Sequence, residues 1–511
     1  MHIPSLFHRP SGYVLASLLC SFGGFIFGVD TGIIGPVTVM HDFKKYVGNP
    51  SPTIHGLIVS SILIPAAISS FFAGKVADAL GRPRGIAIGS FVFAVGATLE
   101  AASVHIGMFI AGRVIEGIGE GLYLGTLVVY ICEISPPRHR GALSTLPQLL
   151  ITLGLVAGFF TCYGTTNMKS SFSWRLPFML LAAYSFIFAM AALTCLPASP
   201  RWLTHHGRNS EASETWERLG ITAADREKIL DQSDDSDIDA TVIASADAST
   251  TTTDKSSRQK PVSESKKVRF LDMFSNADPR LFFAVFLMGM LQLSGIDGVL
   301  YYAPLLFQQA GISSNESTFL ASGISAIVIF AVTIPATIWA DRWGRRANAI
   351  LGGFGMAFTM FLMGGLYAGK AVHAGTGTGR WVVIVAIYVF AVIYSVSWAV
   401  GIKIYVAEIQ PQKSRASATS IAHGSNWLCN FLVALVTPTL LANTGYGAYF
   451  LFGACTCLTA VVCWVFMPET QGRSLDEIER AFDGVHVHGA RGLVRTIRTK
   501  VLGKTPTAMG V

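Results

Sequence analysis

The sequence predicts an all-α membrane protein in which twelve spanning helices form two six-helix halves. The first observation is compositional: 51% of the 511 residues are hydrophobic and only 14% are charged, whereas a soluble domain carries about 25% charged residues. The second is a series of apolar segments long enough to cross a bilayer. The third is an internal repeat. The mean hydropathy of +0.50 agrees with a chain that lies mostly in lipid.

A spanning helix needs about 20 mainly apolar residues. Twelve segments meet this requirement, at approximately 12–38, 56–79, 85–104, 107–131, 142–163, 176–196, 281–308, 319–340, 348–368, 381–407, 417–441 and 447–467. They predict a six-helix half at 1–196, a cytoplasmic linker at 197–280, a second half at 281–468 and a cytoplasmic tail at 469–511. The polar, low-complexity centre of the linker is predicted to be disordered, and its flank "SETWERLG" to form a short surface helix.

Positive charges in the short loops predict the orientation. They concentrate on one set of loops, at Arg82, Arg84, Arg138, Arg140, Arg342, Arg345, Arg346, Lys413 and Arg415. Because such loops remain in the cytoplasm, both termini and the linker are predicted to lie inside a plasma membrane. The net charge of +7 then requires no nucleic-acid partner. No nucleophile–base pair, metal cluster or phosphate loop in the sequence indicates an enzyme, a metal or a cofactor.

The two halves repeat each other. "DALGRPR" from Asp78 matches "DRWGRRA" from Asp341, and "EISPPRHR" from Glu133 matches "EIQPQKSR" from Glu408. "FGVDTG" around Asp30 matches "SGIDGV" in the second half at a similar offset. Repeated six-helix halves are typical of transporters that rock about a central site.

Six further motifs are specific as a set. They are "GRVIEGIGEG" (112–121), "EISPPRHRGAL" (133–143), "SPRWL" (199–203), "QLSGIDGVLYYAP" (292–304), "SNWL" (425–428) and "PETQGRSLDEIE" (468–479). Together they resemble the sugar porter branch of the major facilitator superfamily, over nearly the whole chain outside 1–10, 205–270 and the C-terminal tail. The resemblance implies a major facilitator fold and proton-coupled import of a monosaccharide or sugar acid, such as galacturonate, by alternating access.

Charged residues at the cytoplasmic helix ends are expected to form a gate. The resemblance implies salt bridges between the halves that hold one state and part in the other, made by Asp78, Arg82, Glu133, Arg140, Asp341, Arg345, Glu408 and Arg415. A breakable charge network suits a two-state gate. The alternative is that the positive charges only anchor the topology, which leaves the acidic partners without a role.

Asp30 lies in the middle of a predicted helix, and an ionisable residue at that depth indicates a functional site. The resemblance implies that Asp30 takes the coupled proton and that Arg113 is its partner. A carboxylate that exchanges an arginine contact for a proton couples protonation to conformation. The alternative is a fixed buried ion pair.

Polar and aromatic residues on the central helices match the family's substrate positions. The resemblance implies that Gln148, Gln292, Asn426 and Trp427 contact sugar, and that Tyr301 and Tyr302 close the outer side. Amides donate and accept hydrogen bonds, which suits hydroxyl groups, and an indole offers a flat apolar face to a sugar ring. Any single one of these residues could instead serve packing.

Glu116, Glu120, Asp297 and Lys403 depart from the family pattern. Together with Asp30 and Arg113, the intramembrane charges count four acidic residues against two basic ones. An unpaired charge at depth costs at least ~2.5 kcal/mol, so at least one carboxylate is expected to be protonated in some state. Arg113 and Glu116 also share a helix face, which allows an ordinary intrahelical pair.

Lys403 admits three interpretations. It snorkels to the cytoplasm near Glu408, it pairs with Asp297, or it binds an anionic group of the substrate at a position that faces the sugar in the family. Asp297 argues against a simple anion site unless it is protonated or paired. A neutral hexose or pentose transporter is therefore an alternative function, and a non-transporting nutrient sensor is another, although the short basic tail disfavours a sensor.

Overall fold

A computed structural model describes residues 11–48, 50–222, 226, 279–312, 314–339, 344–372, 377–410 and 415–471. These residues include no strand, which confirms the predicted all-α class. Among them are twelve helical segments long and apolar enough to span a membrane: Gly12–Val39, Pro52–Leu80, Arg82–Ala102, Ile106–Ile134, His139–Thr165, Phe172–Cys195, Pro279–Tyr301, Ser317–Trp339, Arg345–Ala368, Gly379–Glu408, Ala418–Thr444 and Gly447–Phe466. The centre of the linker and nearly all of the tail, for which the sequence made predictions, lie outside the described residues.

The first half consists of nine helices, some of which are collinear parts of one span. They are α1 (Gly12–Val39), α2 (His41–Val47), α3 (Pro52–Ser60), α4 (Leu63–Leu80), α5 (Arg82–Ala102), α6 (Ile106–Ile134), α7 (Pro137–Ser144), α8 (Leu146–Thr165) and α9 (Phe172–Cys195). Helix α5 packs between α6 and α9, and α1 packs along α8.

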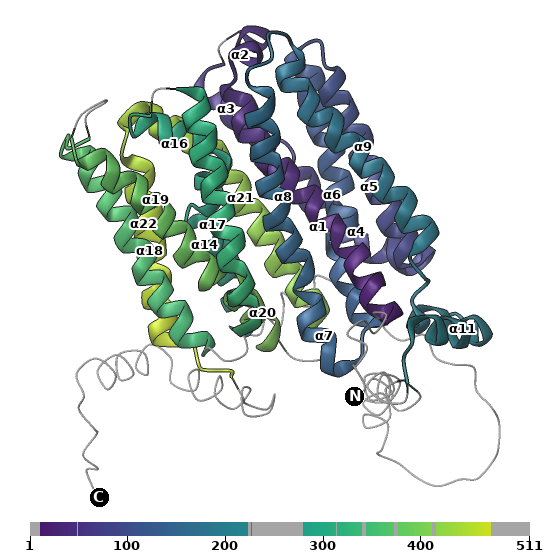
Figure 1. The fold of residues 1–511 in the computed structure, drawn as a ribbon. Helices are drawn as coiled ribbons and strands as arrows, with labels where there is room; N and C mark the ends of the chain where they lie inside the picture. The colour runs from purple at the N-terminus through teal and green to yellow at the C-terminus, as the bar shows by residue number, and fades with distance from the viewer. Residues whose placement is uncertain are drawn as a thin grey trace, which may run out of the picture.

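The second half is built in the same way. Its helices are α14 (Pro279–Leu293), α15 (Ile296–Tyr301), α16 (Ala303–Gln309), α17 (Asn315–Trp339), α18 (Arg345–Ala368), α19 (Gly379–Val396), α20 (Trp398–Glu408), α21 (Arg415–Thr444) and α22 (Gly447–Phe466). Figure 1 shows the two halves side by side, with α8 against α17 and with α21 beside the first half, where it contacts α3 and α4.

Two short helices follow the first half and define one face of the molecule. They are α10 (Pro200–His205) and α11 (Asn209–Leu219), and α1 begins and α22 ends at this same end of the bundle (Figure 1). We call this end the linker face and the opposite end the far face. The structure confirms the predicted surface helix at "SETWERLG", because α11 buries Ala212, Trp216 and Leu219 along one side.

Glycines bring α5 and α6 into close contact. A Cβ atom on Gly96 would lie 2.5 Å from the backbone nitrogen of Glu116, and one on Gly112 would lie 2.7 Å from Cγ of Glu100. Lipid offers no hydrophobic drive between helices, so small residues that allow backbones to approach supply packing in its place. The same glycines therefore set two acidic side chains against each other inside the membrane.

The seventh span is not the continuous helix that 281–308 predicts. It breaks after α14 at Ser294 and Gly295, where Gly295 has a φ of 86°, a left-handed conformation that glycine adopts readily. A second break at Tyr302 separates α15 from α16. Because of the first break, Gln292 lies on a different helical segment from Asp297 and Tyr301. The periodicity of apolar residues does not predict either break.

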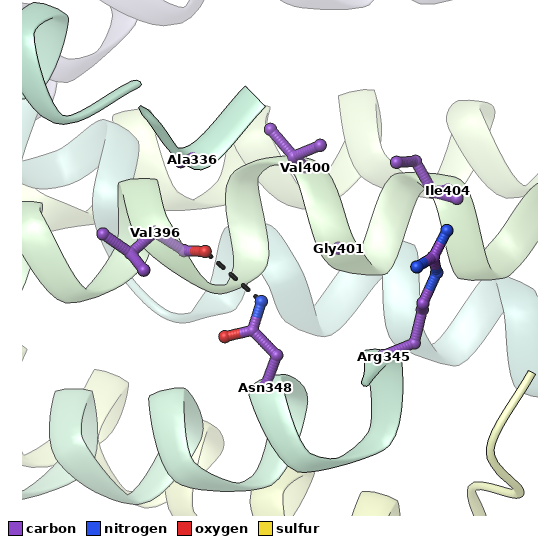
Figure 2. Close-up of a pocket in the computed structure, with 7 residues that line it drawn as sticks. All are labelled: Ala336, Arg345, Asn348, Val396, Val400, Gly401 and Ile404. Carbon is purple, nitrogen blue, oxygen red and sulfur yellow. Dashed lines mark hydrogen bonds between the residues drawn. The ribbon is translucent and has the colours of Figure 1, made fainter. Parts of the chain in front are cut away.

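The tenth span also breaks, at Ser397 between α19 and α20. Asn348 of α18 donates from Nδ2 to the carbonyl oxygen of Val396 at 3.3 Å, which satisfies an acceptor that the break releases. Figure 2 shows this bond in a small pocket lined by Ala336, Arg345, Asn348, Val396, Val400, Gly401 and Ile404. All of these residues belong to the second half, so this pocket supports the helix break and does not lie between the halves.

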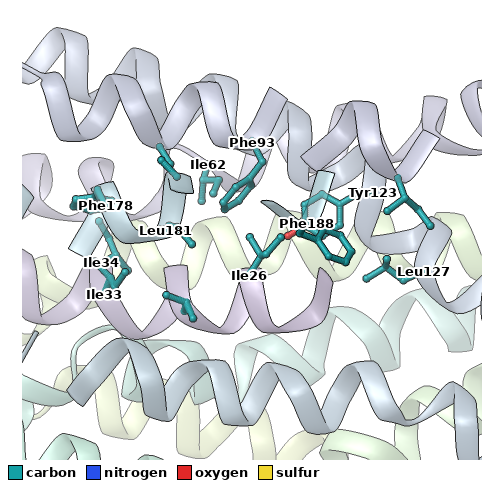
Figure 3. Packing of buried hydrophobic residues seen from close by; sticks show 14 of the residues in the cluster. Ile26, Ile33, Ile34, Ile62, Phe93, Tyr123, Leu127, Phe178, Leu181 and Phe188 are labelled. Atoms are coloured by element: carbon teal, nitrogen blue, oxygen red, sulfur yellow. The ribbon is translucent and has the colours of Figure 1, made fainter. Parts of the chain in front are cut away.

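Two apolar cores divide largely between the halves, although the first also includes Tyr301 and Tyr302 and the second includes Leu155 and Phe159. In the first half, Figure 3 shows Ile26, Phe93, Tyr123 and Phe188 packed together between the helices. Phe93 and Tyr123 are completely buried. This core excludes water from any charge placed within it, so a charge there depends on its protein partners.

We expect Gly96→Ala to destabilise the protein, because the new methyl group overlaps the α6 backbone. Overpacking of this kind costs about 1–3 kcal/mol. The matched control is Gly125→Ala on α6, where a Cβ meets nothing within 4 Å and the higher helix propensity of alanine applies. Thermal unfolding in detergent checks the pair, and equal melting temperatures for both variants would contradict the close packing.

Candidate functional site

A buried arginine organises the centre of the first half. Nη1 of Arg113 on α6 lies 2.5 Å from Oδ1 of Asp30 on α1 and 3.0 Å from Oε2 of Glu116. The Arg113 and Asp30 side chains are 1% and 4% exposed. The structure thus places the two predicted proton-coupling residues in direct contact, and it also contains the intrahelical pair that the sequence left as an alternative.

Glu100 is a member of this cluster that the sequence analysis did not include. Its Oε2 lies 3.9 Å from Nη1 of Arg113, and its side chain is completely buried. Glu100 sits near the far-face end of α5, so in the sequence it resembles a residue at a helix end. A carboxylate inside a predicted span was the available signal, but only the contact between α5 and α6 reveals its partner.

Most of the acidic oxygens in the cluster accept no hydrogen bond. Both oxygens of Glu100, both of Glu120 and Oε1 of Glu116 are buried without a partner in the described part of the chain. The hydroxyl group of Tyr123, also completely buried, is likewise unpartnered. Three carboxyl groups therefore lie within 4 Å of one guanidinium, and Glu120 is a fourth buried acid on the same helix as Arg113. Full ionisation of all four would leave a large uncompensated negative charge.

Amide side chains gather in the second half. Gln292 of α14 donates from Nε2 to Oδ1 of Asn426 on α21 at 3.2 Å, and Asn426 donates from Nδ2 to the Met288 carbonyl at 2.9 Å. The remaining oxygens, Oε1 of Gln292 and Oδ1 of Asn430, are buried and have no partner. Two predicted substrate residues are thus brought together with free acceptors, and Asn430 is a neighbour that the sequence analysis did not name.

The other predicted substrate residues lie where the halves meet. Lys403 of α20 donates from Nζ to Oε1 of Gln148 on α8 at 3.4 Å. The Trp427 ring lies edge-on to Phe27 of α1, with 6.4 Å between centroids. Both contacts join one half to the other, so these residues face the interface and not the lipid.

Asp297 faces the same region from α15. It interacts electrostatically with Lys403 and lies within hydrogen-bonding reach of Gln292 and Asn430. No salt bridge closer than 4.0 Å joins Asp297 to Lys403 in the described residues. The lysine charge is therefore shared between Asp297 and the Gln148 amide.

The two predicted outer-gate tyrosines contact the first half toward the far face. A Cβ on Gly35 of α1 would lie 2.0 Å from the Tyr301 carbonyl oxygen, so the two backbones touch. The Tyr302 ring lies edge-on to His55 of α3 at 5.4 Å, and its hydroxyl donates to the Ala434 carbonyl at 2.6 Å. The first and second halves are consequently in contact at this end.

Ion pairs at the linker face repeat between the halves. Arg82 contacts Asp78 at 2.9 Å and Glu133 at 3.0 Å, and Arg345 contacts Glu408 at 3.2 Å. Each of these pairs lies within one half, although the prediction placed the bridges between halves. Of the other predicted gate residues, Arg140 is described, whereas Asp341 and the side chain of Arg415 lie outside the described residues.

Glu469 caps the start of α18. The sequence indicated this residue only as part of the motif "PETQGRSLDEIE". Its carboxylate accepts from the backbone nitrogens of Arg345 at 2.8 Å and Arg346 at 3.1 Å. The first N–H groups of a helix have no partner within the helix, and an anion there is also favoured by the helix dipole. Glu469 thereby ties the end of the last span to the helix that carries Arg345.

Twelve spans in two repeated halves, with a charge cluster in one and amides facing the interface, define a membrane transporter of the major facilitator type. The family model described as "Sugar (and other) transporter" matches residues 16–482. The chain therefore belongs to this family of transporters, which are not enzymes.

Individual proteins with similar sequences are also sugar transporters. A galactose transporter of Saccharomyces cerevisiae is 30% identical over 93% of this chain and 82% of its own. A high-affinity glucose transporter of Kluyveromyces lactis is 28% identical over 92% of this chain and 84% of its own. The fold is similar to the partially occluded inward-open xylose transporter XylE from E. coli, with a TM-score of 0.71 at 24% identity, over 91% of this chain and 100% of that chain.

We expect Glu469→Ala to destabilise the protein by about 1–2 kcal/mol, as does loss of an N-terminal capping side chain, because the α18 N–H groups lose their acceptor. Glu469→Gln retains an acceptor oxygen and should lose less. Glu214→Ala, an exposed position on α11, serves as the control. The melting temperature in detergent measures all three, and an equal drop for Glu469 and Glu214 variants would refute the capping role.

Proposed function

We propose that this protein is a proton-coupled symporter that imports a monosaccharide across the plasma membrane by alternating access. The observation that carries the proposal is the buried contact between Asp30 and Arg113, 2.5 Å long and sealed in an apolar core. A carboxylate so placed is stable when ionised only while the arginine stays. Protonation of Asp30 releases Arg113 and thus changes the contact between α1 and α6.

Tyr301 supports a link between this contact and the substrate region. It interacts electrostatically with Asp30 and Glu120 of the first half and with Asp297 of the second, and its hydroxyl accepts from Asn430 at 3.5 Å. Tyr301 also contacts the first half toward the far face. A change at Asp30 therefore reaches both the amide-lined region and the gate through packed groups.

The substrate in this proposal is held by Gln148, Gln292, Asn426 and Trp427. The unpartnered oxygens of Gln292 and Asn430 suit sugar hydroxyl donors, because buried acceptors without a partner are costly until a ligand supplies one. The names of the relatives, which include glucose and galactose transporters, agree with such a substrate.

The linker face is cytoplasmic in this proposal, with both termini on that side, since it carries the arginine-rich loops. The ion pairs Arg82–Glu133 and Arg345–Glu408 lie within their own halves, while the halves touch between Gly35 and Tyr301 toward the far face. In the opposite state, we infer that these arginines and carboxylates pair between the halves and close the linker face. Breaking and remaking such pairs gives two stable arrangements.

Asp30→Asn is expected to abolish sugar-dependent proton entry, because asparagine keeps the shape but takes no proton. A panel of glucose, galactose, xylose and galacturonate first identifies a transported sugar in proteoliposomes, and an internal pH dye then reports proton entry. Glu211→Gln, on the exposed side of α11, is the control and should retain entry. Persistent sugar-driven acidification in Asp30→Asn would overturn proton coupling through this residue.

A sugar acid is the second candidate substrate, and Lys403 is the observation that favours it. Its ammonium lies at the interface beside Gln148, where it would meet a carboxylate on a bound sugar. Asp297 offsets part of that charge, so the site suits an anion when Asp297 is protonated and a neutral sugar when it is ionised.

Galactose and galacturonate distinguish the two candidates, because they differ only in the carboxylate. If Lys403 binds that group, Lys403→Gln should reduce the ratio of galacturonate to galactose uptake at least about tenfold, the effect of one charge-assisted hydrogen bond worth about 1.5–3 kcal/mol. Competition of each compound against a transported labelled sugar provides the ratio. An unaltered ratio assigns Lys403 to pairing with Asp297 or to snorkelling.

A further inference from the structure

The proposed proton exchange between Asp30 and Arg113 leaves one pair of neighbouring buried acids without an assigned role. The carboxyl groups of Glu100 on α5 and Glu116 on α6 lie within hydrogen-bonding reach of each other. Both side chains are 0% exposed. As carboxylates they are acceptors only, and three of their four oxygens accordingly have no hydrogen-bond partner.

A proton between the two groups resolves this arrangement. The proton provides a hydrogen-bond donor between the two carboxyl groups and neutralises one of their two adjacent negative charges. No further side chain is needed. Two carboxyl groups that share a dry site do not both ionise readily. A single proton can bridge two carboxyl oxygens directly, without further ligands.

We propose that Glu100 and Glu116 form a second proton-binding site, in which the pair holds one proton and passes it to Asp30. Three contacts carry the inference, because the same atom, Nη1 of Arg113, faces Asp30 at 2.5 Å, Glu116 at 3.0 Å and Glu100 at 3.9 Å. The proposal rests on the proposed role of Asp30 as the coupling carboxylate.

Arg113 links the two sites. While the pair holds its proton, the strongest neighbouring anion for the guanidinium is Asp30. When the proton moves from the pair to Asp30, Asp30 becomes neutral and the pair carries two negative charges, so Arg113 turns toward Glu116 and Glu100. The total charge of the cluster is unchanged by this transfer. Asp30 then releases its proton on the linker side, and the pair is reloaded from the far face, near which Glu100 lies.

The surroundings of the pair contain few other charges. Asp30 and Arg113 face it from α1 and α6, and Glu120 and Tyr123 follow further along α6. From α9, Arg175 donates to the carbonyl oxygens of Ala101 at 2.5 Å and Ser103 at 2.7 Å, next to the end of α5. Arg175 therefore caps the end of α5 beside Glu100.

The test is the pH dependence of sugar uptake in proteoliposomes. Glu116→Gln and Glu100→Gln fix the pair in its proton-loaded charge, so Arg113 remains with Asp30 and the pair has no proton to pass on. Transport then requires a higher proton concentration. We expect the pH midpoint of uptake to move about one unit to the acid side in each variant, at the lower end of the effect of an adjacent charge. Glu211→Gln, the exposed control, should keep the wild-type midpoint. Unchanged midpoints in both Gln variants would overturn the proposal.

Infrared spectroscopy tests the site without transport. The comparison is made in a Glu120→Gln background, because Glu120 is a further buried carboxyl group without a partner. In this background the protein should contain a protonated buried carboxyl band that persists when Asp30→Asn is added and is lost when Glu116→Gln is added. Absence of the band in the background protein, or its full survival with both Glu116→Gln and Glu100→Gln, refutes the second site even if a Gln variant is inactive. The two proposals fail separately: unaltered proton entry in Asp30→Asn removes coupling through Asp30, whereas the band component that Glu116→Gln removes reports on the pair.

Discussion

The guanidinium of Arg113 is the group on which the first half depends. It is almost completely buried and is surrounded by more carboxyl groups than one positive charge can neutralise. Removal of a partner from such a buried pair costs about 3–5 kcal/mol, so every change in protonation forces a rearrangement of contacts. A buried charge with several alternative partners is suited to switching, because its preference depends on which acid carries a proton.

The apolar packing around the cluster makes that preference strong. Phe93, Tyr123 and Phe188 exclude water, and the glycines of α5 and α6 bring Glu100 next to Glu116. Coulomb interactions weaken as the local dielectric constant rises. The same charges on a hydrated surface would exchange partners at little cost and would not move a helix. In this half, the packing of the helices therefore determines how strongly the buried charges interact.

The internal repeat distinguishes features that the two halves share from features that only one half has. Arg82 with Glu133 and Arg345 with Glu408 form the same pair in each half, as expected from the internal repeat. The repeat also places Asp30 and Asp297 at matching positions, yet Asp30 contacts an arginine directly, whereas Asp297 shares Lys403 with Gln148. The direct pair suits a proton switch, and the looser arrangement leaves polar groups available for a ligand.

The spans and the repeat were predictable, because apolar length and motif spacing are local properties of the sequence. The depth of Asp30 in its helix was predictable in the same way, whereas its partnership with Arg113 followed only from the resemblance to a known family. The breaks at Gly295 and Ser397 were not predicted, because a glycine or serine inside a span-length apolar segment is equally compatible with a continuous membrane helix. Glu100 and Glu469 were also not predicted as partners, since their contacts, with Arg113 and with the α18 backbone, are made by segments distant in the sequence.

By itself, the sequence determined that the chain spans the membrane twelve times in two related halves, because burial in lipid requires long apolar helices and leaves intramembrane charges conspicuous. The tertiary structure alone decided which of those charges meet. Close approach of α5 to α6 added Glu100 to the arginine cluster, and the meeting of α8 with α20 gave Lys403 its amide partner. Interactions between charges depend on distances of a few ångströms, and only the packing of the helices sets those distances.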